Sequence, residues 1–342
     1  MTFASFWERV RSTVSVLAWR LVFTNDVRVA KQPPVALGIS DSLTYSYIPQ
    51  PPHHSTATEG SASGPPCQPF SKSANWRNPH GAARGLKDGR ADTIAQYLRV
   101  LREAQPAAFL LENVFGLAYR VNQAALRLLQ RGIAEAGYTF ACGVLNAADF
   151  GVPQIRERFF LVGARKDLRP QGLQLPSPTH GEGAPLLRLK PYATAKEAFD
   201  GLPPQQVTPE LVLRGKHAHL LPLVPPGENY LHFTAHRGHP KPLFRWRSRY
   251  WSFLLKLHPN RPSWTIQASP GPAIGPFHWE NRRLTIEEIR RIQTFPDSYT
   301  IVGSRHSVQR QLGNAVPCML ARVIGDAIQR QLFERGSRSR WC

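Results

Sequence analysis

The chain has 342 residues, of which 42% are hydrophobic, so it can bury a large core and is not a disordered chain. Its 43 Lys and Arg residues outnumber the 23 Asp and Glu residues, and the formal net charge of +20 favours a polyanionic partner, with nucleic acid as the first candidate. The basic residues are dispersed along the chain, so a generally arginine-rich composition is the alternative explanation. The four cysteines lie far apart without metal-ligand spacing, and we expect neither disulfides nor a bound metal.

The first 63 residues have little regular patterning. Apolar residues at helical spacing predict a short helix over residues 4–23, and the Pro- and Ser-rich stretch 31–63 is typical of irregular chain. No strand followed by a glycine-rich turn is recognisable before residue 64. Charged residues interrupt the apolar opening, so no membrane span is expected, and the small-residue cleavage pattern of a signal peptide is absent. The widely spaced cysteines fit a reducing cytoplasm best.

A regular alternation of helices and strands begins at Asp92. The expected elements are a helix from Asp92 or Thr93 to about Arg102, a strand at 109–111, a helix at 121–136, and strands at 138–145 and 159–162. This order predicts a mostly parallel, doubly wound sheet, in which ligands bind at the carboxyl ends of the strands. Cys67 and Glu112 are expected at that edge.

The texture changes after residue 166. Residues 166–281 are rich in Pro, Gly, Arg, His and aromatic residues, which indicates a separate, loop-rich domain. Regular structure resumes at Thr285, where Thr285 and Glu288 have the spacing of a capping box. A final amphipathic helix is expected after Pro317.

The stretch Gly64–Ser71 presents one cysteine from a constrained loop. Pro65 and Pro66 precede Cys67 and Pro69 follows it, so the backbone on both sides of the thiol has limited freedom. Such a turn can hold a nucleophile. Taken alone, it is also compatible with an inert cysteine in a proline-rich surface turn.

Other short motifs follow in a defined order. These are Glu112-Asn113-Val114, the run Leu145–Pro153, Gln154-Ile155-Arg156-Glu157-Arg158, Arg283-Leu284-Thr285, Gln293–Asp297 and Gln311–Pro317. Together with Pro66-Cys67-Gln68 they closely resemble the ordered motifs of the cytosine-5 DNA methyltransferase family, over roughly residues 64–332. No single motif is specific, but their common order makes coincidence improbable.

The resemblance implies a mechanism in which Cys67 adds to carbon 6 of cytosine and thereby activates carbon 5. Glu112 would hold ring nitrogen 3, with a surface ion pair as the alternative role. Arg158 and Arg156 would hold the carbonyl oxygen of the base and the catalytic loop. A phosphate contact or an ion pair with Glu157 is the alternative for Arg156.

The resemblance also implies that the target base is flipped out of duplex DNA. The basic segment 71–90, including Ser71, Lys72 and Arg84, would close over the DNA, although a solvated basic loop is the alternative. In the middle domain, Arg245 and Arg247 would contact DNA. Their aromatic neighbours fit a DNA-binding face and a domain core equally well.

The implied methyl donor is S-adenosylmethionine, which Pro66, Asn314 and Ala315 would help to hold. The family's early glycine-rich donor turn is not recognisable here, because Gly38 and Gly60 are the only glycines before residue 64. Replacement or misreading of the amino-terminal part, supply of that part by another chain, and unfamiliar donor-binding residues remain as explanations. We favour the first and expect weak or absent donor binding.

We therefore expect a Rossmann-like, S-adenosylmethionine-dependent methyltransferase sheet with a smaller, loop-rich target-recognition domain. The expected regions are an atypical one at 1–63, a catalytic α/β domain at 64–165, a target-recognition domain at 166–281, and a segment at 282–342 that returns to the catalytic domain. The expected protein is a monomeric bacterial restriction-modification enzyme that acts on double-stranded DNA in the cytoplasm, associated with the nucleoid. A tRNA cytosine-5 methyltransferase and an inactive DNA-binding remnant are the alternatives.

Overall fold

A computed structural model describes residues 19–21, 60–63, 92–182, 189–204 and 206–333 of the chain. The chain divides into two compact units. The first, called the sheet unit below, consists of Met1–Leu145, Glu157–Ser177 and Val323–Cys342. The second, called the loop-rich unit, consists of Asn146–Arg156 and Pro178–Arg322.

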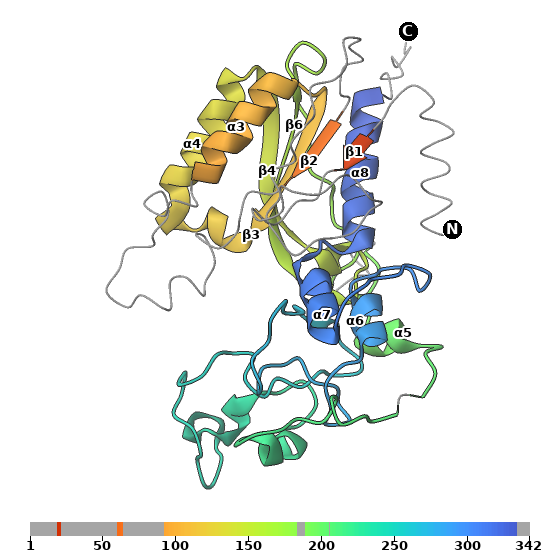
Figure 1. The fold of residues 1–342 in the computed structure, drawn as a ribbon. Coiled ribbons are helices and arrows are strands. Elements are labelled where there is room, and N and C mark those ends of the chain that lie inside the picture. Colours follow the sequence, from red (N-terminus) through yellow and green to blue (C-terminus); the bar gives the residue numbers. More distant parts are fainter. Residues whose placement is uncertain (1–18, 22–59, 64–91, 183–188, 205, 334–342) are drawn as a thin grey trace. The chain divides into compact units, whose positions relative to one another are not determined.

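The sheet unit is built on a five-stranded sheet with the order β1-β2-β3-β6-β4 (Figure 1). Its strands are β1 (Trp19–Leu21), β2 (Gly60–Ser63), β3 (Ala108–Val114), β4 (Tyr138–Asn146) and β6 (Glu157–Arg165). β1 pairs in parallel with β2, and β2 with β3, while β6 runs antiparallel to β3. The α/β class is confirmed, and the antiparallel strand is a feature that the alternation of elements did not predict.

Two helices cover one face of this sheet. They are α3 (Asp92–Ala104) and α4 (Gln123–Glu135), which lie together beside β3 and β4 in Figure 1. Phe109 and Leu111 of β3 point into the same core cluster as Leu98 of α3 and Leu129 of α4. Because side chains alternate along a strand, Glu112 points to the opposite face of the sheet. The helices and strands expected between residues 92 and 165 are all present.

The amino-terminal expectation needs a correction. Trp19–Leu21 is a strand in the structure, although it falls inside the helix expected over residues 4–23. Gly60–Ser63 also forms a strand before residue 64, directly ahead of the Cys67 stretch. β1 pairs with β2, and β2 in turn pairs with β3. In Trp19–Leu21 this main-chain pairing has overridden the local helical pattern. The remainder of residues 1–63 lies outside the described residues.

The loop-rich unit contains short elements joined by long loops. They are η6 (Ala147–Phe150), β5 (Gln154–Ile155), α5 (Ala195–Phe199), η7 (Ala218–Leu223), η8 (Tyr230–Phe233), η9 (Ala235–Arg237), β7 (Ser263–Trp264), α6 (Ile286–Ile292) and α7 (Arg305–Asn314). The sheet unit also has η4 (Phe115–Ala118) and η5 (Arg120–Asn122), and α8 (Cys318–Phe333) follows Pro317 as expected.

Two apolar clusters hold the loop-rich unit together. One joins Leu221, Tyr230 and Phe253 with other buried residues, and the second joins residues of α6 and α7, including Ile289 and Leu312. The capping box at the start of α6 is present, because the Thr285 side chain accepts from the Glu288 amide and the Glu288 carboxylate accepts from the Thr285 amide. Within the part of the chain that the structure describes, no helix is long and apolar enough to cross a membrane.

Candidate functional site

A carboxylate and a guanidinium meet on neighbouring strands of the sheet unit. Glu112 on β3 lies opposite Phe160 on β6, and Arg158 lies opposite Val114, so Glu112 and Arg158 are diagonal neighbours in the antiparallel register. The Arg158 Nε atom is 3.2 Å from the Glu112 Oε1 atom. The two side chains are 17% and 26% exposed, respectively, so both remain accessible from solvent.

This pair offers a charged donor and a carboxyl group side by side. Arg158 Nη1 also donates to the main-chain oxygen of Glu157 at 2.8 Å, which orients the guanidinium. Both residues lie on the face of the sheet opposite the α3 and α4 core, because Phe109 and Leu111 occupy that core. The sequence identified both residues, but only the strand register brings them into contact.

Arg156, two residues earlier in the chain, belongs to the loop-rich unit and has a different environment. It is 1% exposed, and its guanidinium donates to the main-chain oxygens of Gly313 at 2.7 Å and Ile266 at 3.3 Å. Its amide donates to Asn146 Oδ1 at 3.0 Å. A solvent-facing phosphate contact, considered from the sequence, is therefore wrong: burial leaves the side chain inaccessible to a DNA backbone.

A second buried polar group lies beside Arg156 in the chain. Gln154 is fully buried, donates to Gln293 Oε1 at 3.1 Å and accepts from the Ile266 amide at 3.0 Å. Gln293 in turn donates to the main-chain oxygen of Leu312. Buried amides that are satisfied in this way fix the positions of the segments they join. Three motifs distant in sequence thus share one hydrogen-bond network.

The Gly-Asn-Ala-Val-Pro run begins at the end of α7. A Cβ atom at Gly313 would lie 2.5 Å from the Ala268 Cα and amide nitrogen atoms, so this position requires glycine. Asn314 is exposed and Ala315 is partly buried. The Asn314 amide is accessible to a ligand and has the donor and acceptor groups that a polar cofactor needs, so this part of the expected donor site fits S-adenosylmethionine.

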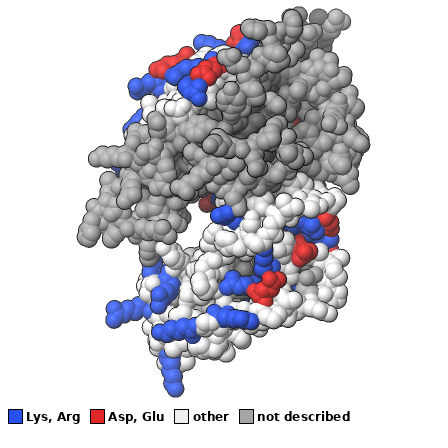
Figure 2. All heavy atoms as spheres, viewed as in Figure 1, with Lys and Arg blue, Asp and Glu red and all other residues white. Residues whose placement is uncertain are grey.

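The basic and aromatic stretch 243–251 divides between surface and core. Arg245 and Arg247 are exposed, and projecting Lys and Arg side chains are visible on the loop-rich unit in Figure 2. Trp246 is 42% exposed and contacts His236, with ring centroids 3.8 Å apart and the ring planes tilted by 39°. Phe244, in contrast, packs against the apolar cluster around Tyr230. The aromatic residues of this stretch are thus divided between the domain core and the exposed surface.

Several expected site residues cannot be placed. Cys67, Pro66, Ser71, Lys72 and Arg84 lie outside the described residues. Two other cysteines are described, and burial raises the pKa of the Cys318 thiol to about 12. A thiol with that pKa carries almost no thiolate near neutral pH.

A group of buried ionisable residues lies at the start of α6. Arg282 pairs with Glu288 at 2.7 Å, and His278 lies 3.6 Å from the same carboxylate. Burial and the Arg282 charge lower the pKa of His278 to about 4, so this imidazole is neutral at physiological pH. Burial also lowers the pKa of Lys256 to about 8, and its ammonium donates to Asn281 Oδ1 at 2.6 Å.

The mixed α/β sheet covered by helices is consistent with a methyltransferase fold, and a partly exposed carboxylate and arginine lie on two of its adjacent strands. Residues 58–330 match the family model described as C-5 cytosine-specific DNA methylase. The chain belongs to this family and is an enzyme of the DNA cytosine-5 methyltransferase kind.

Curated relatives agree with this assignment. The type II methyltransferase M.SacI of Streptomyces achromogenes is 43% identical over 290 residues, covering 80% of this chain and 72% of the relative. The type II methyltransferase M.FnuDI of Fusobacterium nucleatum is 30% identical over 283 residues, covering 81% and 78%, respectively. The relatives thus support a type II restriction-modification methyltransferase.

A solved structure supports the fold. A crystal structure described as a DNA modification methyltransferase encoded within an E. coli prophage matches with a TM-score of 0.53 at 21% identity. The match covers 82% of this chain and 80% of that one. The similarity confirms the methyltransferase fold expected from the sequence, and enzymes of this family use S-adenosylmethionine as methyl donor.

Proposed function

We propose that this chain transfers a methyl group from S-adenosylmethionine to carbon 5 of a cytosine flipped out of double-stranded DNA. The observation that carries the proposal is the contact between Glu112 and Arg158, at 3.2 Å, at the partly exposed end of the β3–β6 strand pair. Cytosine has its carbonyl oxygen and ring nitrogen 3 on adjacent atoms of one edge. Because Glu112 and Arg158 are in contact, they are well placed to bind these two neighbouring atoms of the base at the same time.

In this mechanism the Cys67 thiolate adds to carbon 6 of the base. The Glu112 carboxyl group hydrogen-bonds or protonates nitrogen 3, and the Arg158 guanidinium donates to the oxygen as it gains negative charge. When bound, S-adenosylmethionine would supply an electrophilic methyl group, which carbon 5 would take as the methyl–sulfur bond breaks and the neutral thioether is released. A base then takes the proton from carbon 5, the carbon 5–carbon 6 double bond re-forms, and the Cys67 thiolate leaves.

Arg156 acts as a positioning residue in this proposal. Its two hydrogen bonds to main-chain oxygens hold Ile266 and Gly313, and Gly313 immediately precedes Asn314. Asn314 and Ala315, with Pro66, would hold the methyl donor. Because no glycine-rich donor turn is recognisable in the amino-terminal region, we expect purified protein to bind S-adenosylmethionine only weakly, so that methyl transfer is slow. Calorimetry giving a micromolar dissociation constant would contradict this expectation.

Duplex DNA would lie against the exposed basic side chains. Arg245 and Arg247, together with Ser71, Lys72 and Arg84 of the segment after Cys67, would contact it. Replacing Arg245 or Arg247 with alanine should weaken binding and lower the salt dependence, because each lost phosphate contact reduces the slope of log K against log salt by about 0.9. An unchanged slope would count against this placement.

Bisulfite sequencing of plasmid from a host that expresses the chain tests the reaction. Methylated cytosines at a recurring sequence are expected, and Glu112→Gln should remove them while leaving DNA binding intact. Unmethylated plasmid with DNA binding retained would instead indicate the non-catalytic remnant. Methylation found only in transfer RNA would indicate the RNA enzyme.

A further inference from the structure

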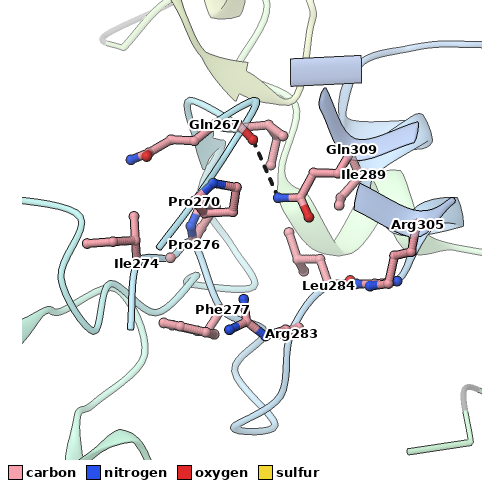
Figure 3. A pocket seen from close by; sticks show the side chains of 12 residues that line it. Gln267, Pro270, Ile274, Pro276, Phe277, Arg283, Leu284, Ile289, Arg305 and Gln309 are labelled. Atoms are coloured by element: carbon pink, nitrogen blue, oxygen red, sulfur yellow. Dashed lines mark hydrogen bonds between the residues drawn. The ribbon is translucent and has the colours of Figure 1, made fainter. Parts of the chain in front are cut away.

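A small pocket in the loop-rich unit has two guanidinium groups in its wall. It is lined by residues of the loop 266–277 and of α6 and α7, and by Arg283 and Arg305 (Figure 3). Its volume of about 20 Å³ suits one or two water molecules and is too small for a nucleobase. A ligand group recognised here must therefore be compact and held largely by the rim.

Both arginines have hydrogen-bonding capacity to spare. Arg283 donates one hydrogen bond, at 2.7 Å, to the main-chain oxygen of Pro272 and lies over the Phe277 ring at 5.8 Å. Arg305 donates to the main-chain oxygen of Leu284. Each guanidinium has five N–H groups, so most of them remain available to another acceptor. Among the described residues, neither arginine has a carboxylate at ion-pair distance.

The electrostatics of the pocket favour an anion. Burial, and second the charge of Arg305, lower the pKa of Arg283, which means that the two cations repel each other at close range. Arg305 is also the first residue of the ten-residue helix α7, where the helix dipole adds further positive potential. Two half-buried cations without a carboxylate are stabilised by an anion placed between them.

We propose that Arg283 and Arg305 form a phosphate-binding site that takes one backbone phosphate of the DNA substrate. The inference rests on the proposed function, because it requires DNA as the substrate. It adds to that function an anchor on the loop-rich unit outside the stretch 243–251. A phosphate carries no sequence information, so this contact would fix the orientation of the duplex rather than the choice of target.

The test is the salt dependence of duplex binding by the full chain, measured by fluorescence anisotropy between 50 and 200 mM NaCl. The variant Arg283→Gln/Arg305→Gln should lower the slope of log K against log salt by about 0.9, the value for one phosphate. Over this fourfold range its affinity should therefore fall about 3.5-fold less than that of the wild type. Arg131→Gln, an exposed arginine on α4 in the sheet unit, is the matched control and should leave the slope unchanged.

Each outcome decides the proposal. If the wild type binds DNA and the double variant shows an unchanged slope, the phosphate site is overturned while the proposed function stands. A wild type that does not bind DNA overturns the proposed function as well. If the double variant fails to fold, Arg305→Gln alone is used, and a slope equal to that of the wild type refutes the site. Inorganic phosphate is the second probe: protection of the wild type from thermal unfolding at millimolar phosphate, without a slope change, would assign the site to free phosphate instead.

Discussion

Replacing Arg156 with methionine should destabilise the loop-rich unit strongly. The change removes two hydrogen bonds, to Gly313 and Ile266, from a side chain that is only 1% exposed. Hydrogen bonds from a charged donor contribute about 1.5–3 kcal/mol each, and the relief of removing a buried charge offsets part of that sum. We expect a net loss of about 3 kcal/mol, which lowers the Tm by about 6–12 °C for a domain of this size.

Arg158→Met is the matched comparison, because it makes the same substitution at an arginine only two residues further along the chain. Its ion pair with Glu112 is partly exposed, so its loss should cost about 0–1 kcal/mol. Loss of a donor to the reacting base should instead lower kcat by about 10²–10³-fold. Differential scanning calorimetry and methyl transfer to duplex DNA measure the two effects. An Arg156→Met protein with wild-type Tm, or an Arg158→Met protein equally destabilised, would refute the division between positioning and substrate contact.

Three further changes test the loop-rich unit. Thr285→Ala removes the cap that accepts from the Glu288 amide and should lower the free energy of unfolding by about 1 kcal/mol, measured by denaturant titration. Gly313→Ala should cost about 1–3 kcal/mol through overpacking against main-chain atoms, and a Tm equal to that of the wild type would contradict this. The buried Lys256 has a pKa lowered to about 8 from 10.5, so the unfolded chain binds more protons between these values and stability should rise from pH 8 to pH 10.5. Lys256→Met should remove this rise, and a pH profile identical to that of the wild type would show that another group causes it.

The sequence by itself determined the family and most regular elements of the described chain. Ordered motifs from Glu112 to Pro317 need no tertiary information, because each is a local string of residues. The helix after Asp92, the strand through Leu111 and the capping box at Thr285 follow from local periodicity and side-chain chemistry, and all are present. Local rules suffice where local interactions dominate.

Tertiary structure alone decided how the motif residues are used. Arg156 and Arg158 look alike in sequence, yet one is buried against main-chain oxygens and the other pairs with a carboxylate on a neighbouring strand. Pairing with β2 made a strand of Trp19–Leu21 despite its helical pattern. Arg283 and Arg305 likewise line one pocket, although no local signal connects the two segments. Burial and strand register depend on segments distant in the chain, which is the physical reason why sequence patterns could name these residues but not assign their environments.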